Sequence, residues 1–189
     1  MEIVAICASP RAKGNTATLL EALLEGAREA GATTHRFDPA GMRISACDAC
    51  RACLENAEAG CILDDDMQRI YAALRRADAW VFATPVYFWH TTASLKLVID
   101  RLYAFYTEEG GWRLGLPGRR RGAVIVVQAD ADKETPARVA AYLTSVLRDL
   151  NVEVVGSIAE GSLDAPGDAA KRPDLLVQAR ELGRQLASL

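Results

Sequence analysis

Four cysteines are clustered in the sequence, and their spacing is suited to metal or redox chemistry. They are Cys47, Cys50, Cys53 and Cys61. Two residues separate each of the first three cysteines from the next, so one short loop can present three thiolates to a single centre, and the fourth follows after seven intervening residues. This pattern suits a 4Fe-4S cluster, as in bacterial ferredoxin segments. A zinc ion held by the same thiolates and unmetallated thiols are the two alternatives. The fifth cysteine, Cys7, lies in an apolar run, where a small apolar side chain explains it.

The loop formed by residues 9–16 is a second candidate site, because it joins an apolar run to an amphipathic segment. A helix that begins here would direct unpaired N–H groups and the positive end of its dipole at a phosphate. The loop has neither a Walker A lysine nor the three spaced glycines of a dinucleotide-binding loop, so it favours a monophosphate. A capped helix with charged surface residues is the structural alternative. The candidate ligands are Ser9, Arg11, Gly14, Asn15 and Thr16.

A third candidate is residues 84–90, where three consecutive aromatic side chains follow an apolar run. Solvent would normally favour polar residues here, so we expect something flat and partly apolar to pack against them. An isoalloxazine ring would satisfy this loop, with hydrogen bonds from the main chain of Val86 and Tyr87. An aromatic patch at a subunit interface is the alternative, and both interpretations can hold. The candidate ligands are Pro85, Val86, Tyr87 and Phe88.

The elements that must position these loops alternate between strand and helix patterns. Apolar runs rich in β-branched residues predict buried strands, and apolar residues at helical spacing predict a helix after each one. The expected strands are 3–8, 33–37, 79–83, 123–127 and 152–158, and the expected helices are 15–27, 67–77, 95–102, 139–147 and 174–186. Parallel strands need helical crossovers, so this alternation predicts a doubly wound α/β fold with a parallel sheet between two helical layers.

Length and composition predict one domain over residues 1–189 with one insertion. The insertion is 38–63, a stretch of 26 residues that carries the cysteine cluster, whereas a β/α connection usually takes about 2–6 residues. The net charge is −3 and the basic residues are dispersed, which argues against nucleic acid as a partner. No apolar stretch reaches the roughly 18 residues of a membrane span, and the acidic start does not fit a secretory signal. We therefore expect a cytoplasmic protein that does not enter a membrane.

In their order along the chain, these motifs resemble the flavodoxin-like NAD(P)H-dependent FMN reductases, and within them the iron-sulfur flavoprotein branch. The matching segments are Ser9-Pro10-Arg11 with Gly14-Asn15-Thr16, the four clustered cysteines with Asp65-Asp66-Met67, Thr84-Pro85-Val86-Tyr87, and Lys96-x-x-x-Asp100-Arg101. The resemblance implies a flavodoxin-like five-stranded sheet of order 2-1-3-4-5, FMN phosphate on loop 9–16 and the flavin ring against 85–88. It also implies a homodimer or tetramer with active sites near the subunit interface. The sequence departs from the family at 128–131, which lacks the expected glycines, and in the long gap before Cys61.

The resemblance further implies an FMN-dependent oxidoreductase. Such an enzyme takes hydride from NAD(P)H and passes electrons to a small acceptor such as a quinone, free flavin, an azo compound or iron. The cofactor performs the chemistry, so no catalytic acid or base is expected among the side chains. The rival hypothesis is a one-electron carrier that docks on protein partners, which a cluster on the cysteines would favour. A zinc-stabilised binding module without flavin is a third hypothesis.

Three charged groups are expected to be structural. One of Asp64, Asp65 and Asp66 is expected to cap the helix that follows. Lys96 and Asp100 lie four residues apart on a predicted helix and should form an exposed ion pair. The run of arginines at 119–121 is interpreted as a solvated segment before a strand.

Overall fold

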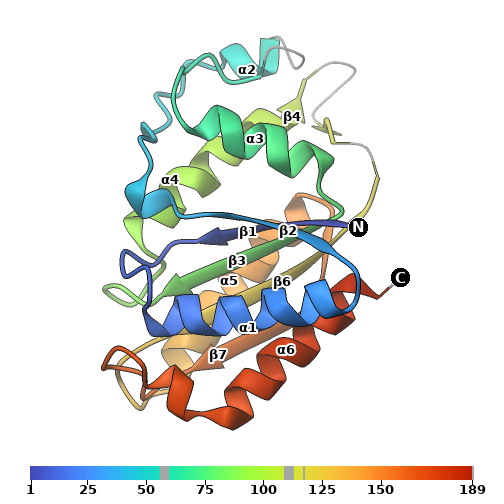
Figure 1. The fold of residues 1–189 in the computed structure, drawn as a ribbon. Coiled ribbons are helices and arrows are strands. Elements are labelled where there is room, and N and C mark those ends of the chain that lie inside the picture. Colours follow the sequence, from blue (N-terminus) through green and yellow to red (C-terminus); the bar gives the residue numbers. More distant parts are fainter. Residues whose placement is uncertain (56–59, 109–112, 117, 189) are drawn as a thin grey trace.

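The computed structural model describes residues 1–55, 60–108, 113–116 and 118–188 (Figure 1). Its main sheet has five parallel strands in the order β2-β1-β3-β6-β7. The strands are β1 (Glu2–Cys7), β2 (Thr33–Phe37), β3 (Ala79–Pro85), β6 (Arg120–Val127) and β7 (Val152–Glu160). The longer helices are α1 (Asn15–Glu29), α3 (Met67–Arg76), α4 (Ala93–Arg101), α5 (Glu134–Asp149) and α6 (Pro173–Ala187). When these five strands are counted along the chain, the order is 2-1-3-4-5, so the predicted doubly wound fold is confirmed.

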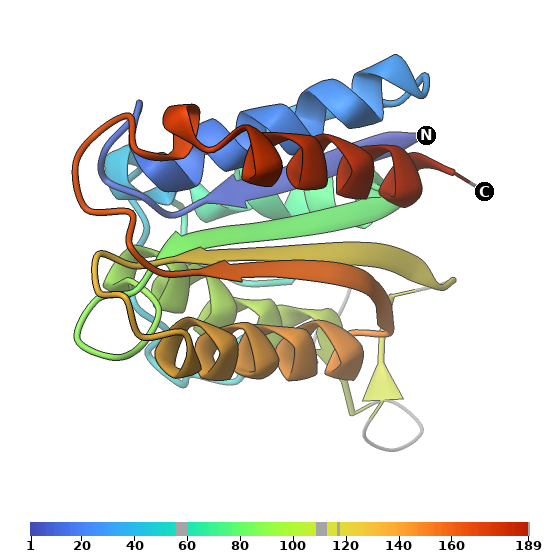
Figure 2. The same ribbon diagram turned by 90° about the horizontal axis from the view of Figure 1, so that it is seen from below.

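The sheet lies between two helical layers, because successive residues of a buried strand point to opposite faces. In β1, Ile3 and Ala5 pack with α1 and α6, whereas Val4 and Ile6 pack with α3, α4 and α5. Figure 2 shows this arrangement, with α1 and α6 on one side of the sheet and α5 on the other. Both faces of the central strands are buried, which explains why their sequences are continuous apolar runs instead of alternating ones.

Two glycines allow α1 and α6 to approach closely. A Cβ atom at Gly26 would lie 1.9 Å from the carbonyl oxygen of Arg180, and one at Gly183 would lie 1.9 Å from that of Leu23. No side chain fits at these distances, so the two helices pack main chain against main chain here. A third glycine, Gly31, has a φ of +89° and ends α1 as its position predicts.

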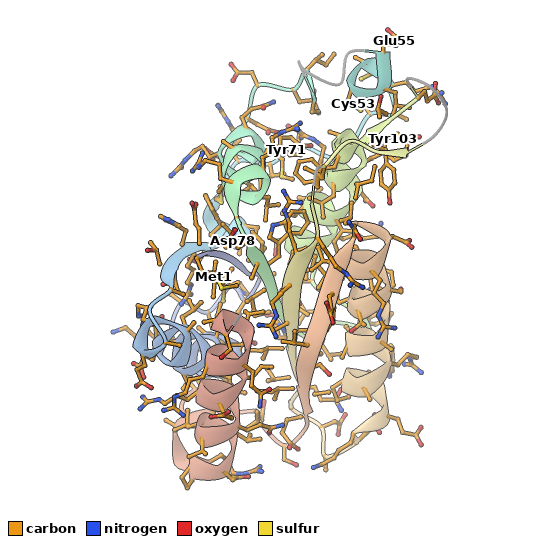
Figure 3. All side chains as sticks on the ribbon, turned by 90° about the vertical axis from the view of Figure 1, so that its right-hand side faces the viewer. Met1, Cys53, Glu55, Tyr71, Asp78 and Tyr103 are labelled. Atoms are coloured by element: carbon orange, nitrogen blue, oxygen red, sulfur yellow. The ribbon has the colours of Figure 1, made fainter. Side chains whose placement is uncertain are left out.

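The structure adds elements that no sequence pattern predicts. The two-residue strands β4 (Tyr106–Thr107) and β5 (Arg113–Leu114) form a small antiparallel pair. Insertion 38–63 contains two short helices, η1 (Pro39–Gly41) and α2 (Ala52–Glu55), and its residues 56–59 lie outside the described part of the chain. Two further short helices are η2 (Leu102–Phe105) and η3 (Ala169–Lys171). Figure 3 shows Cys53 and Glu55 of α2 at the same end of the molecule as Tyr103 of η2.

The prediction that residues 119–121 form a solvated run is wrong for its central arginine. Arg120 is buried at the start of β6, where its guanidinium donates to the carbonyl oxygens of Ala77 and Arg75. It also lies over the ring of Trp80. Burial lowers the pKa of Arg120. Its role is therefore to satisfy the last carbonyls around the end of α3.

None of the described helices has both the length and the apolar composition that a bilayer crossing requires.

Candidate functional site

A cavity of about 130 Å³ lies at the carboxyl ends of β1, β3, β6 and β7, the edge where open α/β sheets bind ligands. It is lined by Ser9, Arg11, Gly14, Asn15, Thr16, Pro85, Val86, Tyr87, Val127, Gln128, Ala129, Leu163 and Asp164. We call it the first cavity. Eight of the nine predicted ligand positions of the two loops line it, and the ninth, Phe88, lines the cavity next to it. The fold therefore brings together two loops that are about 70 residues apart in the sequence.

The loop at 9–16 leaves the start of α1 open toward the first cavity. Gly14 is the N-cap residue and provides no side-chain cap. The N–H of Thr18 donates to the carbonyl of Gly14 (2.9 Å), so the three N–H groups before it precede the first intrahelical bond. The loop itself is closed by hydrogen bonds from the N–H of Arg11 to Ser9 Oγ (3.2 Å) and from the N–H of Gly14 to the carbonyl of Arg11 (2.9 Å). Unpaired N–H groups, a hydroxyl and an exposed arginine form a donor set that fits a phosphate.

This loop requires glycine at position 14 because a side chain has no room there. A Cβ atom at this position would lie 2.9 Å from the Cβ of Arg11 and 3.2 Å from the Arg11 carbonyl oxygen. The φ angle of Gly14 is −77°, so a left-handed conformation is not involved. The glycine therefore allows the loop to fold tightly on itself.

Asn15, a predicted ligand, lines the first cavity, and its side chain is hydrogen-bonded within the protein. Its Nδ2 donates to the carbonyls of Leu163 (2.9 Å) and Ala165 (3.0 Å), and its Oδ1 accepts from the N–H of Ala169 (3.0 Å). The side chain of Asn15 thus fastens the segment after β7 to the start of α1, and only its main chain is free to face a ligand. The loop at 161–169 was not predicted to be part of the site, although it contributes Leu163 and Asp164 to the first cavity.

The loop after β7 also supports the loop after β6. The N–H of Ser162 donates to the carbonyl of Asp130 (2.8 Å), and the N–H of Leu163 donates to that of Gln128 (3.0 Å). A Cβ atom at Gly161 would lie 2.4 Å from the Asp130 carbonyl oxygen, so this close contact needs glycine. Residues 128–131 contain no glycine, and the glycine that permits the close contact between these two loops is Gly161 in the loop after β7.

A second cavity of about 270 Å³ adjoins the first and shares Val86, Gln128 and Ala129 with it. The remaining residues that line it are Phe88, Trp89, Asp130, Asp132 and Thr135. The two cavities form one trough, which runs from the phosphate-type loop at 9–16 to the aromatic residues after β3. A ligand with an anionic end and a flat, apolar end matches this arrangement.

The aromatic residues sit on a tight, strained turn. Tyr87 and His90 pair with each other, and the two residues between them have positive φ angles, +47° at Phe88 and +61° at Trp89. Two central residues with positive φ are typical of a type I′ turn, in which glycine or asparagine is usual. Phe88 and Trp89 are 91% and 63% exposed, and the centroids of their rings lie 4.8 Å apart. Backbone strain that presents two large apolar side chains to solvent is characteristic of a functional surface.

The turn also corrects the expected hydrogen bonds to the ring. The N–H of Val86 donates to the carbonyl of Val127 (2.8 Å), and the N–H of Tyr87 donates to the carbonyl of His90 (2.8 Å). Neither N–H is therefore free to donate to a ligand in this structure. The ring of His90 contacts the ring of Tyr142 at 4.7 Å, which ties the turn to α5.

A network of buried hydroxyl groups holds the loops after β1 and β3 together. Thr84 Oγ1 accepts hydrogen bonds from Thr91 Oγ1 (3.1 Å) and from the N–H of Thr92 (3.3 Å). Thr92 caps α4 by accepting from the N–H of Leu95 (3.3 Å), and it donates to the carbonyl of Ala8 (3.1 Å). No sequence pattern indicates this network, although Thr91 and Thr92 directly follow the aromatic motif.

Insertion 38–63 is closed by a clasp that joins the segments on either side of the cysteines. The N–H of Ser45 donates to Asp65 Oδ2 (2.8 Å), and the N–H of Arg43 donates to Asp66 Oδ2 (2.8 Å). Arg101 donates from Nη1 to both Asp65 Oδ2 (2.9 Å) and the carbonyl of Ser45 (3.0 Å). Asp65 Oδ1 also accepts from the N–H of Met67, the first residue of α3, and Asp65 forms a buried ion pair in addition. Asp66 is the N-cap residue but makes no side-chain cap bond, so the predicted capping holds only as this bond from Asp65 to the helix start. The predicted ion pair between Lys96 and Asp100 is also confirmed (2.5 Å).

The four cysteine thiols lie in one region but do not form a metal site as they stand. Cys47 and Cys50 are exposed, and Cys53 and Cys61 are half-buried. Burial, followed by the neighbouring thiols, chiefly that of Cys61, raises the pKa of Cys53. Within the ranges described above, no three His, Cys, Asp or Glu side chains are grouped closely enough to hold a metal ion. Cys7 is fully buried, as expected.

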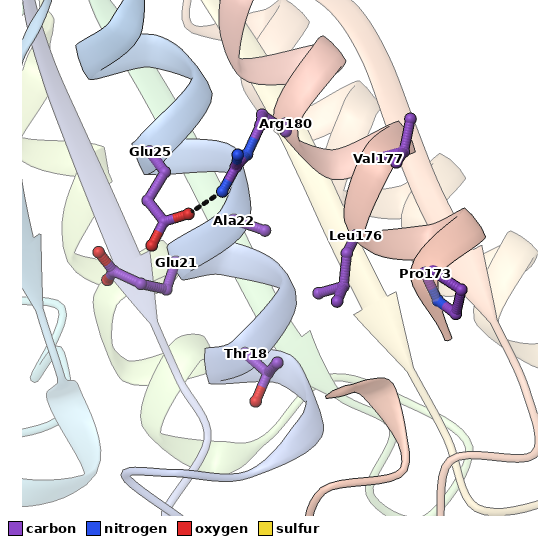
Figure 4. A pocket seen from close by; sticks show the side chains of 8 residues that line it. All are labelled: Thr18, Glu21, Ala22, Glu25, Pro173, Leu176, Val177 and Arg180. Carbon is purple, nitrogen blue, oxygen red and sulfur yellow. Dashed lines mark hydrogen bonds and ion pairs between the residues drawn. The ribbon is translucent and has the colours of Figure 1, made fainter. Parts of the chain in front are cut away.

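A larger cavity of about 560 Å³ lies between α1 and α6, away from the two loops. Figure 4 shows Leu176 pointing from α6 toward α1, and an ion pair between Glu25 and Arg180 beside it. It has no phosphate-type loop and none of the predicted ligand residues line it. The trough at the carboxyl edge of the sheet is therefore the candidate functional site.

The chain matches known proteins along most of its length. The family model described as NADPH-dependent FMN reductase matches residues 1–162, which include both loops and the insertion. The chain is 33% identical to an iron-sulfur flavoprotein of Archaeoglobus fulgidus over 187 residues, which is 99% of this chain and 79% of that protein. It is 38% identical to an iron-sulfur flavoprotein of Methanosarcina thermophila over 101 residues, 53% of this chain and 52% of that protein.

Solved structures agree with the fold. An NAD(P)H:quinone oxidoreductase from Methanothermobacter marburgensis has a TM-score of 0.74 and 26% identity, with 98% of each chain covered. An FMN-dependent NADH-azoreductase from Bacillus anthracis, solved in complex with FMN, has a TM-score of 0.68 at 15% identity over the full length of both chains, a similarity of fold alone. Because the family model covers most of the sequence, the chain belongs to the NADPH-dependent FMN reductase family.

Proposed function

We propose that this oxidoreductase binds FMN in the trough, with the phosphate on loop 9–16 and the ring toward the aromatic turn. It would take hydride from NAD(P)H and pass electrons to a small acceptor such as a quinone, free flavin, an azo compound or iron. The observation that carries this proposal is the continuity of the two cavities, because an anionic end and an apolar end of one ligand find matching surroundings.

The residues of the chain fit FMN at the phosphate end. The open start of α1, Ser9 Oγ and the guanidinium of Arg11 would hold the phosphate, and Thr16 adds a buried hydroxyl beside them. At the other end, Val86 and the aromatic turn would orient the ring and shield it from water. When FMN is bound it supplies the hydride chemistry, and the protein supplies position and electrostatics.

The names of the relatives support the direction of electron flow. The Methanothermobacter protein is called an NAD(P)H:quinone oxidoreductase, and the Bacillus anthracis protein an FMN-dependent NADH-azoreductase. Both names combine a nicotinamide donor with a small acceptor. A nicotinamide donor and a small organic acceptor are therefore the first compounds to test.

The experiment that separates a reductase from an electron carrier is anaerobic mixing of the FMN-loaded protein with NADH and with NADPH. The proposal predicts that absorbance near ~450 nm is lost within seconds, because hydride reduces the bound flavin. Flavin that stays oxidised with both nicotinamides, but accepts electrons from a partner reductase, would assign the protein to the carriers.

A second proposal concerns Cys47, Cys50, Cys53 and Cys61, which we propose as ligands of a 4Fe-4S cluster. Their spacing and the name iron-sulfur flavoprotein carried by the relatives favour it. The thiols are not grouped for a metal in the structure, so binding would have to reorganise the loop, as is common when metal binding and folding are coupled. Protein produced anaerobically with iron and sulfide should contain about four irons per subunit. Zinc instead of iron, or four freely titrating thiols, would exclude the cluster.

We also propose a homodimer or tetramer, since Phe88 and Trp89 expose apolar surface that a second subunit could cover together with a bound ligand. Sedimentation equilibrium should give a mass of two or four subunits. A monomer at micromolar concentration would contradict this proposal.

A further inference from the structure

The second cavity combines aromatic and acidic residues, and this combination has a consequence for the acceptor. The turn after β3 contributes Phe88 and Trp89, the segment between β6 and α5 contributes Asp130 and Asp132, and the first turn of α5 contributes Thr135. The aromatic side chains offer stacking surface to a flat molecule. The carboxylates determine which charge that molecule can carry.

The two carboxylates are not neutralised by cations of the described residues. Asp132 accepts hydrogen bonds from the N–H groups of Glu134 (2.8 Å) and Thr135 (3.1 Å). Together with the Thr135 hydroxyl, these bonds lower the pKa of Asp132 to about 2, so it is ionised at neutral pH. Asp130 is exposed, and its side chain is in no ion pair in the part of the chain that the structure describes.

Two basic side chains near this part of the chain are engaged with other acids. Lys133 directly follows Asp132 in the sequence and pairs with Glu160 at 2.9 Å. Arg172, which also approaches Glu160, binds Asp174 at 2.7 Å. The cavity therefore keeps the negative charge of both aspartates, and Glu134 in the first turn of α5 adds to it.

We propose that Asp130 and Asp132 are specificity-determining residues: with the FMN ring against the aromatic turn, their carboxylates line the side from which an acceptor would approach the ring, and they favour uncharged or cationic flat acceptors over anionic ones. This inference rests on the proposed function. For a quinone, the reaction balances as two electrons and one proton delivered as hydride by the reduced flavin, with the second proton taken from solvent. The products are the hydroquinone and oxidised FMN.

The charge-removing variant can be made without losing the helix start. Asparagine is as good an N-terminal cap as aspartate, so Asp132→Asn keeps one of the two side-chain oxygens that accept from the first turn of α5. The test variant is Asp130→Asn with Asp132→Asn. A control with the same change in net charge is Glu153→Gln with Glu181→Gln, at two exposed acids on β7 and α6 that do not line the cavity.

The first measurement is equilibrium binding to the oxidised, FMN-loaded protein without NAD(P)H, by calorimetry. The ligands are 1,4-naphthoquinone, its 2-sulfonate and the cationic dye methylene blue. In the test variant, affinity for the sulfonate should rise about three- to ten-fold relative to naphthoquinone, and affinity for methylene blue should fall, because two nearby like charges are removed. These shifts should shrink at high salt and be absent in the control variant.

The second measurement isolates electron transfer to the acceptor. Protein whose flavin has been reduced with dithionite is mixed anaerobically with each acceptor, and the ratio of rates for sulfonate and naphthoquinone should rise by a similar factor in the test variant. Unchanged ratios in both measurements, or equal shifts in the control variant, would overturn the inference. Failure of the proposed function is recognised separately, because the native protein would then bind no FMN or transfer no electrons to any acceptor.

Discussion

Nη1 of Arg101 lies 2.9 Å from Oδ2 of Asp65, and the two side chains are only 1% and 3% exposed. The same guanidinium reaches the carbonyl of Ser45, two residues before the first clustered cysteine. Tyr71 closes the arrangement by donating its hydroxyl to the carbonyl of Arg101 (2.6 Å). This ion pair therefore anchors the cysteine insertion to α3 and α4.

Breaking the pair should be costly, because it leaves one charge buried without a partner. We expect Arg101→Met or Asp65→Asn to lower the free energy of unfolding by about 3–5 kcal/mol. The double variant should lose less than the sum of the two single losses, since neither charge is then left alone. Urea unfolding measures these values.

Asp100→Asn is the matched control, because it breaks the exposed ion pair of Asp100 with Lys96 on the same helix. Exposed pairs contribute about 0–1 kcal/mol. The thiols of Cys53 and Cys61 should also react faster with a thiol reagent in the Arg101→Met protein. Equal stability losses in the control and the test variants would refute the anchoring role.

The ion pair also predicts how stability depends on pH. Burial alone would raise the pKa of Asp65, but hydrogen bonds from Arg101 and from the N–H groups of Ser45 and Met67 outweigh it, and the pKa is lowered. A carboxyl whose folded pKa is depressed stabilises the protein fully above its unfolded pKa of about 3.9 and loses this contribution as the pH falls through the folded pKa. The stability difference between native protein and Asp65→Asn should be constant from pH 7 to about 5 and shrink below about 4. A difference that grows in acid would contradict the assigned direction.

The side chain of Asn15 should support ligand binding by holding the segment after β7 in place, and not by contacting the phosphate. Asn15→Ala removes three hydrogen bonds and leaves buried main-chain groups without partners, which should cost about 1–3 kcal/mol of stability. It should weaken binding of FMN and of riboflavin by the same factor, because it loosens the wall formed by Leu163 and Asp164. Thr18→Ala, which removes a hydroxyl bonded only within its own helix, is the control and should change little. Loss of FMN binding with unchanged riboflavin binding would make Asn15 a phosphate ligand after all.

The close contact of α1 with α6 predicts a large effect for a small substitution. Gly26→Ala introduces a Cβ that would overlap the carbonyl of Arg180, so the helices must separate, and overpacking of this kind costs about 1–3 kcal/mol. Gly41→Ala is the control, because a Cβ there meets nothing within 4 Å. In thermal unfolding, the melting temperature of Gly26→Ala should lie well below that of the native protein, and that of Gly41→Ala should lie close to it. A Gly26→Ala protein as stable as the native one would show that the two helices can separate without cost.

The fold was predictable because its signals are local. A continuous apolar run such as Ile3–Ala8 is typical of a strand that is covered on both faces. A glycine after a helical pattern indicates the end of a helix, and Gly31 has the positive φ angle that this position requires. The strand order came from the family resemblance, since apolar patterns do not say which strands are neighbours. The pair β4 and β5 was missed because two-residue strands carry no period.

The site was predictable in its loops but not in its contacts. Asn15 follows a glycine in a phosphate-type loop, and nothing local reveals that its amide is bound to residues about 150 positions later. Asp65 stands among three aspartates before a helix, so capping is evident while its pairing with Arg101 is not. The positive φ angles at Phe88 and Trp89 oppose what their side chains favour, so the turn that occupies the N–H of Tyr87 had no sequence signal.

The central claim is that loop 9–16 holds the phosphate of FMN, and the most direct test is titration of the flavin-free protein with FMN and with riboflavin, which lacks the phosphate. The native protein should bind FMN at least about ten-fold more tightly than riboflavin. Arg11→Ala should remove most of this preference without weakening the binding of riboflavin, because only the charge-assisted hydrogen bonds to the phosphate are lost. Equal affinity of the native protein for the two flavins would contradict the assignment.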